Sequence, residues 1–175
     1  MHLATASTLA PLDPMTQTLV RRVDVSLEVC MSLFKKILVP IDGSDTADKA
    51  MRMALDMARE SLASVRFMHV IDDDRYFSSY EFSADLRTYA FDNAKKMLQN
   101  AMDAAAALGV NADTQLINKP GQRLGENVAD EAQNWGADLV VVGTHGRRGL
   151  GRVLLGSGAE QVVRLSPVPV LMVRA

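Results

Sequence analysis

The chain alternates between short apolar runs and longer stretches in which apolar residues recur every three or four positions. The short runs are rich in branched side chains, which is typical of strands buried on both faces of a parallel sheet. The spacing in the longer stretches is typical of helices that bury one face. The pattern therefore predicts five strands, at residues 37–41, 65–71, 114–117, 139–143 and 168–173.

The longer stretches predict four helices between these strands. Residues 42–45 (Asp-Gly-Ser-Asp) supply a turn and a cap for the first helix, in which apolar residues from Ala47 to Ala58 follow helical spacing. Gly109 and Gly136 end the second and third helices, because glycine readily adopts the left-handed conformation that follows a helix. The second, third and fourth helices are expected at residues 84–108, from near 121 to 135, and around residues 162–165.

Two of these helices show a clear buried stripe. In the third, Leu124, Val128 and Ala132 lie four residues apart and share one face. In the second, the longest, the stripe is predicted to consist of Leu86, Ala90, Ala94, Met97, Ala101 and Leu108.

Strands that alternate with helices along the whole pattern indicate an α/β fold with a doubly wound, Rossmann-like parallel sheet and helices on both faces. In such sheets, ligands bind beyond the carboxyl ends of the strands, where the strand order reverses. Residues that follow strands are therefore the candidates for a site. They lie at 40–44, 71–74 and 143–158, whereas His69 is interpreted as a strand residue without chemistry.

Residues 1–31 show neither the strand period nor the helix period. We expect a disordered extension or a translation start at Met31, followed by one domain at 32–175.

The 19 basic and 21 acidic residues argue against a dedicated nucleic-acid binder. No apolar run approaches the ~18 residues of a membrane span. A single cysteine and three scattered histidines exclude a disulfide framework and a cysteine or zinc cluster. These bounds favour a cytoplasmic protein.

The glycine-rich segment at 143–158 differs from the common phosphate-binding and nucleophile motifs. None of its glycines precedes the lysine of a phosphate loop, and the dinucleotide fingerprint lacks its third glycine. The Gly-x-Ser-x-Gly nucleophile elbow is also absent. What remains is Gly143-x2-Gly146-x9-Gly156-Ser157, directly after an apolar strand.

This spacing suits a phosphate site on physical grounds. Gly143 allows a sharp turn off the strand, and Gly146 allows the backbone to approach a ligand closely. Residues 156–158 precede a helix, whose first N–H groups can hold phosphate oxygens. The Ser157 hydroxyl has two readings, as a phosphate ligand or as the helix cap. Positive charge gathers beside the segment, at Arg147, Arg148 and Arg152.

The same spacing resembles the ATP-binding signature of the universal stress protein family. Residues 35–44, 69–72 and 167–173 resemble the opening, second and closing strands of that family, so that the resemblance covers about residues 32–175. It implies the strand order 3-2-1-4-5. It also implies ATP as the ligand, with Mg²⁺ held through the phosphates, and a homodimer that pairs through the closing strand Val168–Val173.

By this resemblance the site divides into two halves. Pro40, Ile41 and Asp42 would line the adenosine pocket, with Val70 packed on the base. The remaining ligand residues would be Val142, Gly143, His145, Gly146, Gly156, Ser157 and Gly158. Two of these residues keep a second interpretation, Asp42 as a turn residue that opens the helix and His145 as a turn histidine.

We expect an ATP-binding stress-response or regulatory protein that acts through nucleotide occupancy and dimerisation. The alternative is a slow ATPase in which Asp42 and His145 orient water, although no catalytic residue is assigned. A dimerising scaffold without a ligand would leave the glycine-rich segment unexplained. No membrane or nucleic-acid partner is expected.

Overall fold

The structure is a computed structural model that describes residues 33–71, 83–144 and 156–174. Residues Phe34–Ala175 form one compact unit. The expectations for residues 1–31, as a disordered extension or a misplaced start, lie outside the described residues. Among the residues described, no helix combines the length and the apolarity that a membrane crossing requires.

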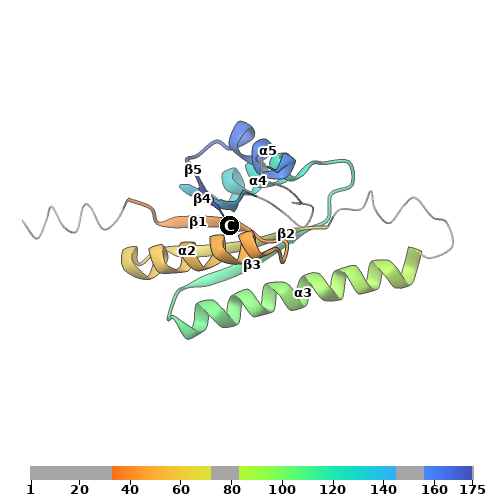
Figure 1. Cartoon of the computed structure of the whole chain (residues 1–175), viewed down its shortest axis with the longest axis horizontal. Helices are drawn as coiled ribbons and strands as arrows, with labels where there is room; N and C mark the ends of the chain where they lie inside the picture. The colour runs from red at the N-terminus through yellow and green to blue at the C-terminus, as the bar shows by residue number, and fades with distance from the viewer. Residues whose placement is uncertain (1–32, 72–82, 145–155, 175) are drawn as a thin grey trace, which may run out of the picture. The chain divides into compact units, whose positions relative to one another are not determined.

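A five-stranded parallel sheet forms the centre of this unit (Figure 1). The strand order is β3-β2-β1-β4-β5, which confirms the predicted doubly wound α/β fold and its order 3-2-1-4-5. The order reverses between β1 and β4, so the switch point lies at their carboxyl ends. The strands are β1 (Lys36–Pro40), β2 (Ser64–Val70), β3 (Ala112–Ile117), β4 (Leu139–Gly143) and β5 (Val170–Val173).

Helices cover both faces of the sheet (Figure 1). Alternate residues of each strand point to opposite faces, so Ile37 and Val39 of β1 belong to one core and Leu38 belongs to the other. We call these the α2–α3 core and the α4–α5 core, after the helices that close them. The helices are α2 (Asp45–Ser61), α3 (Ser83–Ala107), α4 (Leu124–Trp135) and α5 (Ser157–Leu165).

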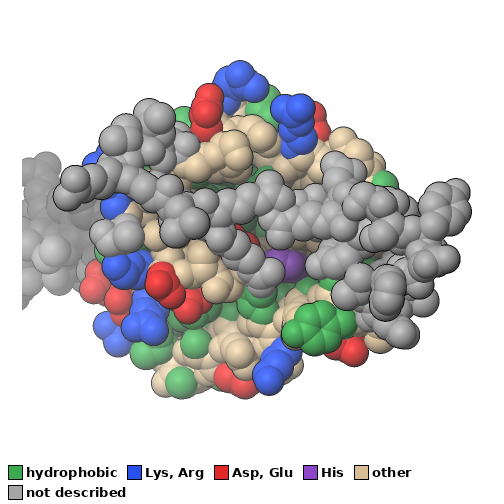
Figure 2. Space-filling model, turned by 45° about the vertical axis from the view of Figure 1, so that its right-hand side comes forward, with side chains coloured by type: hydrophobic (Ala, Val, Ile, Leu, Met, Phe, Trp, Pro, Cys, Tyr) green, Lys and Arg blue, Asp and Glu red, His purple; other side chains and the backbone are tan. Residues whose placement is uncertain are grey.

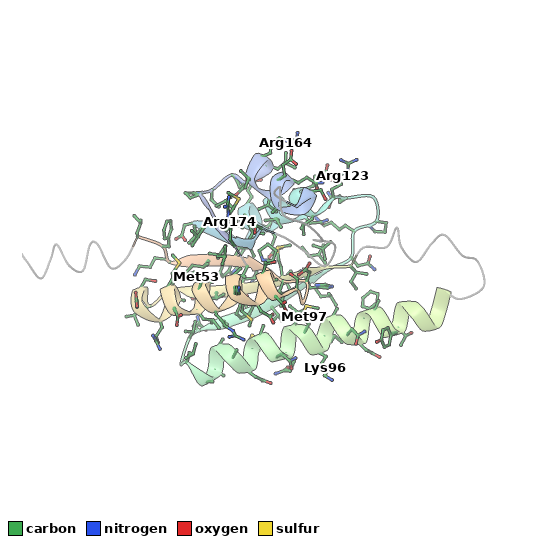
Figure 3. The ribbon with its side chains drawn as sticks, viewed as in Figure 1. Met53, Lys96, Met97, Arg123, Arg164 and Arg174 are labelled. Atoms are coloured by element: carbon green, nitrogen blue, oxygen red, sulfur yellow. The ribbon has the colours of Figure 1, made fainter. Side chains whose placement is uncertain are left out.

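The buried stripe of α3 differs in part from the prediction. Ala94 and Ala101 are buried as expected, and Figure 3 shows Met97 on the sheet side of α3 with Lys96 directed away. Leu108 is 38% exposed, so its assignment to the stripe was wrong. The helix ends at Ala107, and the turn that follows carries Leu108 off the buried face. Two residues that the sequence pattern did not single out, Leu98 and Ala105, are buried instead.

Two elements, β5 and α4, begin later in the chain than the sequence pattern predicts. The closing strand begins at Val170 rather than at residue 168, because Pro167 and Pro169 have no N–H group to donate to a neighbouring strand. The Pro169 carbonyl still accepts a hydrogen bond from the Val140 N–H, at 3.0 Å. The helix α4 begins only at Leu124, after residues 118–123.

A polar cluster fixes α4 against the sheet. The Arg66 guanidinium on β2 contacts Asp113 of β3 (2.5 Å) and Glu131 of α4 (2.8 Å), and it lies 4.8 Å from the centre of the Trp135 ring. The hydrogen bond with Asp113 is the main cause that raises the pKa of Arg66, so the group stays charged. Because Glu131 is 8% exposed, the loss of its cation would leave a buried carboxylate unpaired.

Leu62 offers a test of local strain. It follows α2 in the left-handed conformation, with φ of 53° and a side chain that is 89% exposed. Glycine adopts this conformation without a Cβ clash. We expect Leu62→Gly to raise the free energy of unfolding by about 1 kcal/mol in urea titrations. Leu62→Ala removes the same exposed apolar surface but keeps the strain, and it should leave stability within about 0.5 kcal/mol of wild type. Equal stabilisation by both variants would contradict this account.

Candidate functional site

The turn that follows β1 is held by its own side chains. The Asp42 carboxylate accepts hydrogen bonds from the Ser44 N–H (3.0 Å) and from the Ser44 hydroxyl (2.6 Å). The Ser44 oxygen accepts from the Ala47 N–H and caps α2, as predicted. Gly43 lies between them at φ 74°. Asp42 is therefore a turn residue, and this bonding holds its carboxylate at the end of the strand.

Gly143, the last residue of β4, touches the first turn of α2. A Cβ at this position would lie 2.7 Å from the carbonyl carbon of Thr46 and 2.8 Å from its oxygen. Real side chains essentially never approach backbone atoms so closely, and backbone in a helix cannot move aside cheaply. The glycine is thus required by the packing of β4 against α2, in addition to any contact with a ligand.

Thr144 joins three elements immediately after β4. Its N–H donates to the Val173 carbonyl on β5 at 2.9 Å, and its carbonyl accepts from the Gly156 N–H at 2.8 Å. The residue is 4% exposed. These two bonds hold the start of α5 beside the end of β4, at the switch point of the sheet.

The start of α5 is capped by Gly156, with no side-chain hydrogen bond to the cap among the described residues. Ser157 is the first residue of the helix and is exposed, so the interpretation of Ser157 as the helix cap was wrong. The first N–H groups of a helix have no acceptor within the helix, which makes them donors for an anion. A Cβ at Gly158 would lie 2.8 Å from Leu124 Cδ2, so its small size also serves the packing of α5 on α4.

Strand alternation divides the remaining site residues between the two faces. Val70 and Val142 pack with the α4–α5 core, and Pro40 shares that face because it pairs in register with Met68 of the same core. Ile41 belongs to the α2–α3 core. The structure therefore brings the residues predicted at the ends of β1, β2 and β4 to one edge of the sheet. His145 and Gly146 lie outside the described residues.

Sequence reasoning dismissed one residue at this edge, His69, and did not single out another, Thr144, within its candidate range 143–158. His69, interpreted as a strand residue without chemistry, has Nδ1 2.7 Å from the Ile41 carbonyl oxygen. Thr144 carries the junction described above. The signal that could have found both is their position, since each lies within one residue of the carboxyl end of a strand.

The charge near this edge is mixed. Figure 2 shows one face of the molecule, on which acidic and basic side chains are interspersed. The arginines that the sequence places beside the glycine-rich segment, Arg147, Arg148 and Arg152, lie outside the described residues. Among the residues that the structure describes, no group of three His, Cys, Asp or Glu side chains could hold a metal ion.

Comparisons with known proteins agree on one family. Residues 33–174 match the model of the universal stress protein family. Universal stress protein YxiE of Bacillus subtilis is 35% identical over 151 residues, which cover 81% of this chain and 100% of the relative. The solved structure of MJ0577 has a TM-score of 0.72 at 29% identity, over 82% of this chain and 97% of that one. A universal stress protein solved in complex with cAMP has a TM-score of 0.59 at 26% identity, over 82% and 98%.

Gly143 and Gly158 form a matched pair of variants for the geometry of this edge. Gly143→Ala places a methyl group against the α2 backbone, and we expect a loss of about 2 kcal/mol in the free energy of unfolding. Gly158→Ala meets only the mobile end of Leu124 and gains helix propensity, so its stability should stay within about 1 kcal/mol of wild type. Urea unfolding of both variants measures the difference. Equal stabilities would refute the close approach of β4 to α2.

Proposed function

The chain belongs to the universal stress protein family, and we propose that it is a regulatory protein that binds ATP at the switch point of its sheet. It acts through nucleotide occupancy and through dimerisation, in a response to stress. The domain that carries this function is residues 32–175, and residues 1–31 are not required for it.

One observation carries the proposal. The hydrogen bond from the Gly156 N–H to the Thr144 carbonyl holds the N-terminus of α5 beside the carboxyl end of β4. Phosphate oxygens bind well to N–H groups at a helix N-terminus, and the switch point is where doubly wound sheets bind ligands. The relative that was solved with cAMP supports an adenine nucleotide as the ligand.

The two halves of ATP would contact different elements. Adenosine would lie at the end of β1, against Pro40, Ile41 and Asp42, with Val70 at the base. The phosphates would lie over the turn after β4 and the start of α5. That second half comprises Val142, Gly143, His145, Gly146, Gly156, Ser157 and Gly158.

Magnesium fits this site as a companion of the phosphates. Mg²⁺ in nucleotide sites is usually bound by phosphate oxygens and waters, with few protein ligands. The proposal therefore requires no cluster of carboxylates. The ion would neutralise part of the triphosphate charge, while the chain supplies backbone N–H groups and the Ser157 hydroxyl.

Gly156→Val tests the phosphate half. A β-branched side chain at the helix cap would obstruct the approach of phosphate to the N–H groups of α5. We expect titration calorimetry with ATP and Mg²⁺ to show at least about a tenfold loss of affinity, with an unchanged far-UV circular dichroism spectrum. Gln133→Val places the same side chain at an exposed position in the last turn of α4, and it should bind ATP like wild type.

Failure of the proposed function and failure of the proposed phosphate position give different results. A wild-type protein that binds neither ATP nor another adenine nucleotide refutes the proposed function. Wild-type affinity in the Gly156→Val variant would place the phosphates elsewhere.

The edge strand β5 is the surface proposed for dimerisation. It lies at one end of the strand order, and edge strands pair readily with another chain. Leu171 and Val173 pack against the α2–α3 core, whereas Met172 is 44% exposed. Closed two-fold dimers are the commonest homo-oligomers. Pairing of β5 with the same strand of a second copy would bury this exposed residue.

Met172→Asp should convert the dimer to a monomer, because it places charge in the seam without disturbing the core. Light scattering at micromolar concentration should then give about half the wild-type mass. Tyr89→Asp is the control and should leave the mass unchanged. Tyr89 is 67% exposed on α3, which packs on β2 and β3, away from the edge strand β5. A wild-type protein that is monomeric with and without ATP contradicts the dimer.

A further inference from the structure

His69 connects two strands at the carboxyl edge of the sheet. The paired register of β1 and β2 ends at Pro40 and Met68. Beyond it, the Ile41 N–H donates to the Met68 carbonyl at 2.8 Å, and the Ile41 carbonyl lies 2.7 Å from Nδ1 of His69. Both backbone polar groups of Ile41 are thus held by β2, one of them through a side chain.

This contact fixes the orientation of the peptide between Ile41 and Asp42. No cis peptide bond occurs among the described residues, and in a trans peptide the C=O and the N–H point in opposite directions. The Ile41 carbonyl points to His69 on β2, so the Asp42 N–H points away from β2. Because β1 lies between β2 and β4, that N–H is directed to the side of the switch point.

The imidazole is itself well placed to hold this peptide. His69 is half-buried and pairs in register with Leu116 of β3. Strand alternation puts its side chain on the same face as Phe67, which is fully buried in the α2–α3 core. A ring restrained in this way loses little further freedom when it binds a carbonyl.

We propose that His69 is a positioning residue for the adenosine half of the site. It donates from Nδ1 to the Ile41 carbonyl and so holds the peptide between Ile41 and Asp42 in the orientation that receives adenosine. This inference rests on the proposed function, and it extends that function to a residue next to Val70 that was not predicted as a ligand contact. The phosphate half is built on β4 and α5, whereas the His69 contact described here is with β1.

Two substitutions separate the hydrogen bond from the bulk of the ring. His69→Asn can place its amide nitrogen where Nδ1 stands, whereas His69→Leu is of comparable size without a donor. We expect the leucine variant to bind ATP about tenfold more weakly than wild type in calorimetry, and the asparagine variant to stay within about threefold. Inorganic tripolyphosphate, measured as a competitor of ATP, should bind to all three proteins alike.

Each result bears on the inference. Equal ATP affinity of wild type and His69→Leu overturns it, and so does an equal loss in both variants. A parallel loss of tripolyphosphate binding would show a general structural defect rather than a role at adenosine. If wild type binds no adenine nucleotide, the proposed function itself fails.

The tautomer of His69 tests the hydrogen bond to the Ile41 carbonyl in the wild-type protein, so that this test does not depend on the folding of a variant. A carbonyl oxygen can only accept, so Nδ1 must carry the proton when the ring is neutral. Long-range ¹H–¹⁵N correlation spectra above the titration of the ring should show the Nδ1–H form. Observation of the Nε2–H form would refute the hydrogen bond and, with it, the positioning role. This result is independent of whether ATP binds.

Discussion

Three elements depend on two consecutive residues at the end of β4. The absence of a Cβ at Gly143 lets the strand touch the first turn of α2. The two backbone groups of Thr144 then bind β5 on one side and the start of α5 on the other. A doubly wound sheet has one position where its chain order reverses, and here the packing of four elements converges on that position. The candidate site is built on this junction.

The fold could be predicted because burial leaves a clear pattern. The β4 run at 139–143 is covered by helices on both faces, so nearly every residue is apolar, and its predicted bounds agree with the structure. The predicted bounds were wrong at the ends of elements, where local backbone geometry decides which residue is the last or the first. Leu108 continues the apolar spacing of α3 but follows its last helical residue, and the two prolines before β5 shorten that strand. The strand order came from a family resemblance, because periodicity alone does not specify which strands are neighbours.

The site was predictable to the extent that it depends on position along the chain. The rule that ligands bind at the carboxyl ends of strands led to Asp42 and Gly143, whereas Val70 was implied only by the family resemblance. The contacts of His69 and Thr144 could not be found in this way, since they join residues 12 to 29 positions apart in the chain. Ser157 shows a further limit. A serine before a helical run favours a cap, but the cap position is Gly156, whose N–H donates to the Thr144 carbonyl.

Thr144 also links the proposed phosphate half of the site to the edge strand. The N–H that holds Val173 and the carbonyl that holds Gly156 belong to one residue, and a bound phosphate would restrain the same turn. The proposed nucleotide site and the proposed pairing at β5 would therefore share a structural element, which is the physical requirement for coupling between them. Such coupling is reciprocal, so any nucleotide that strengthens the dimer must bind the dimer more tightly than the monomer by the same factor. In the proposed function, regulation by occupancy would need no hydrolysis, because a ligand that binds one assembly state more tightly shifts the equilibrium toward it.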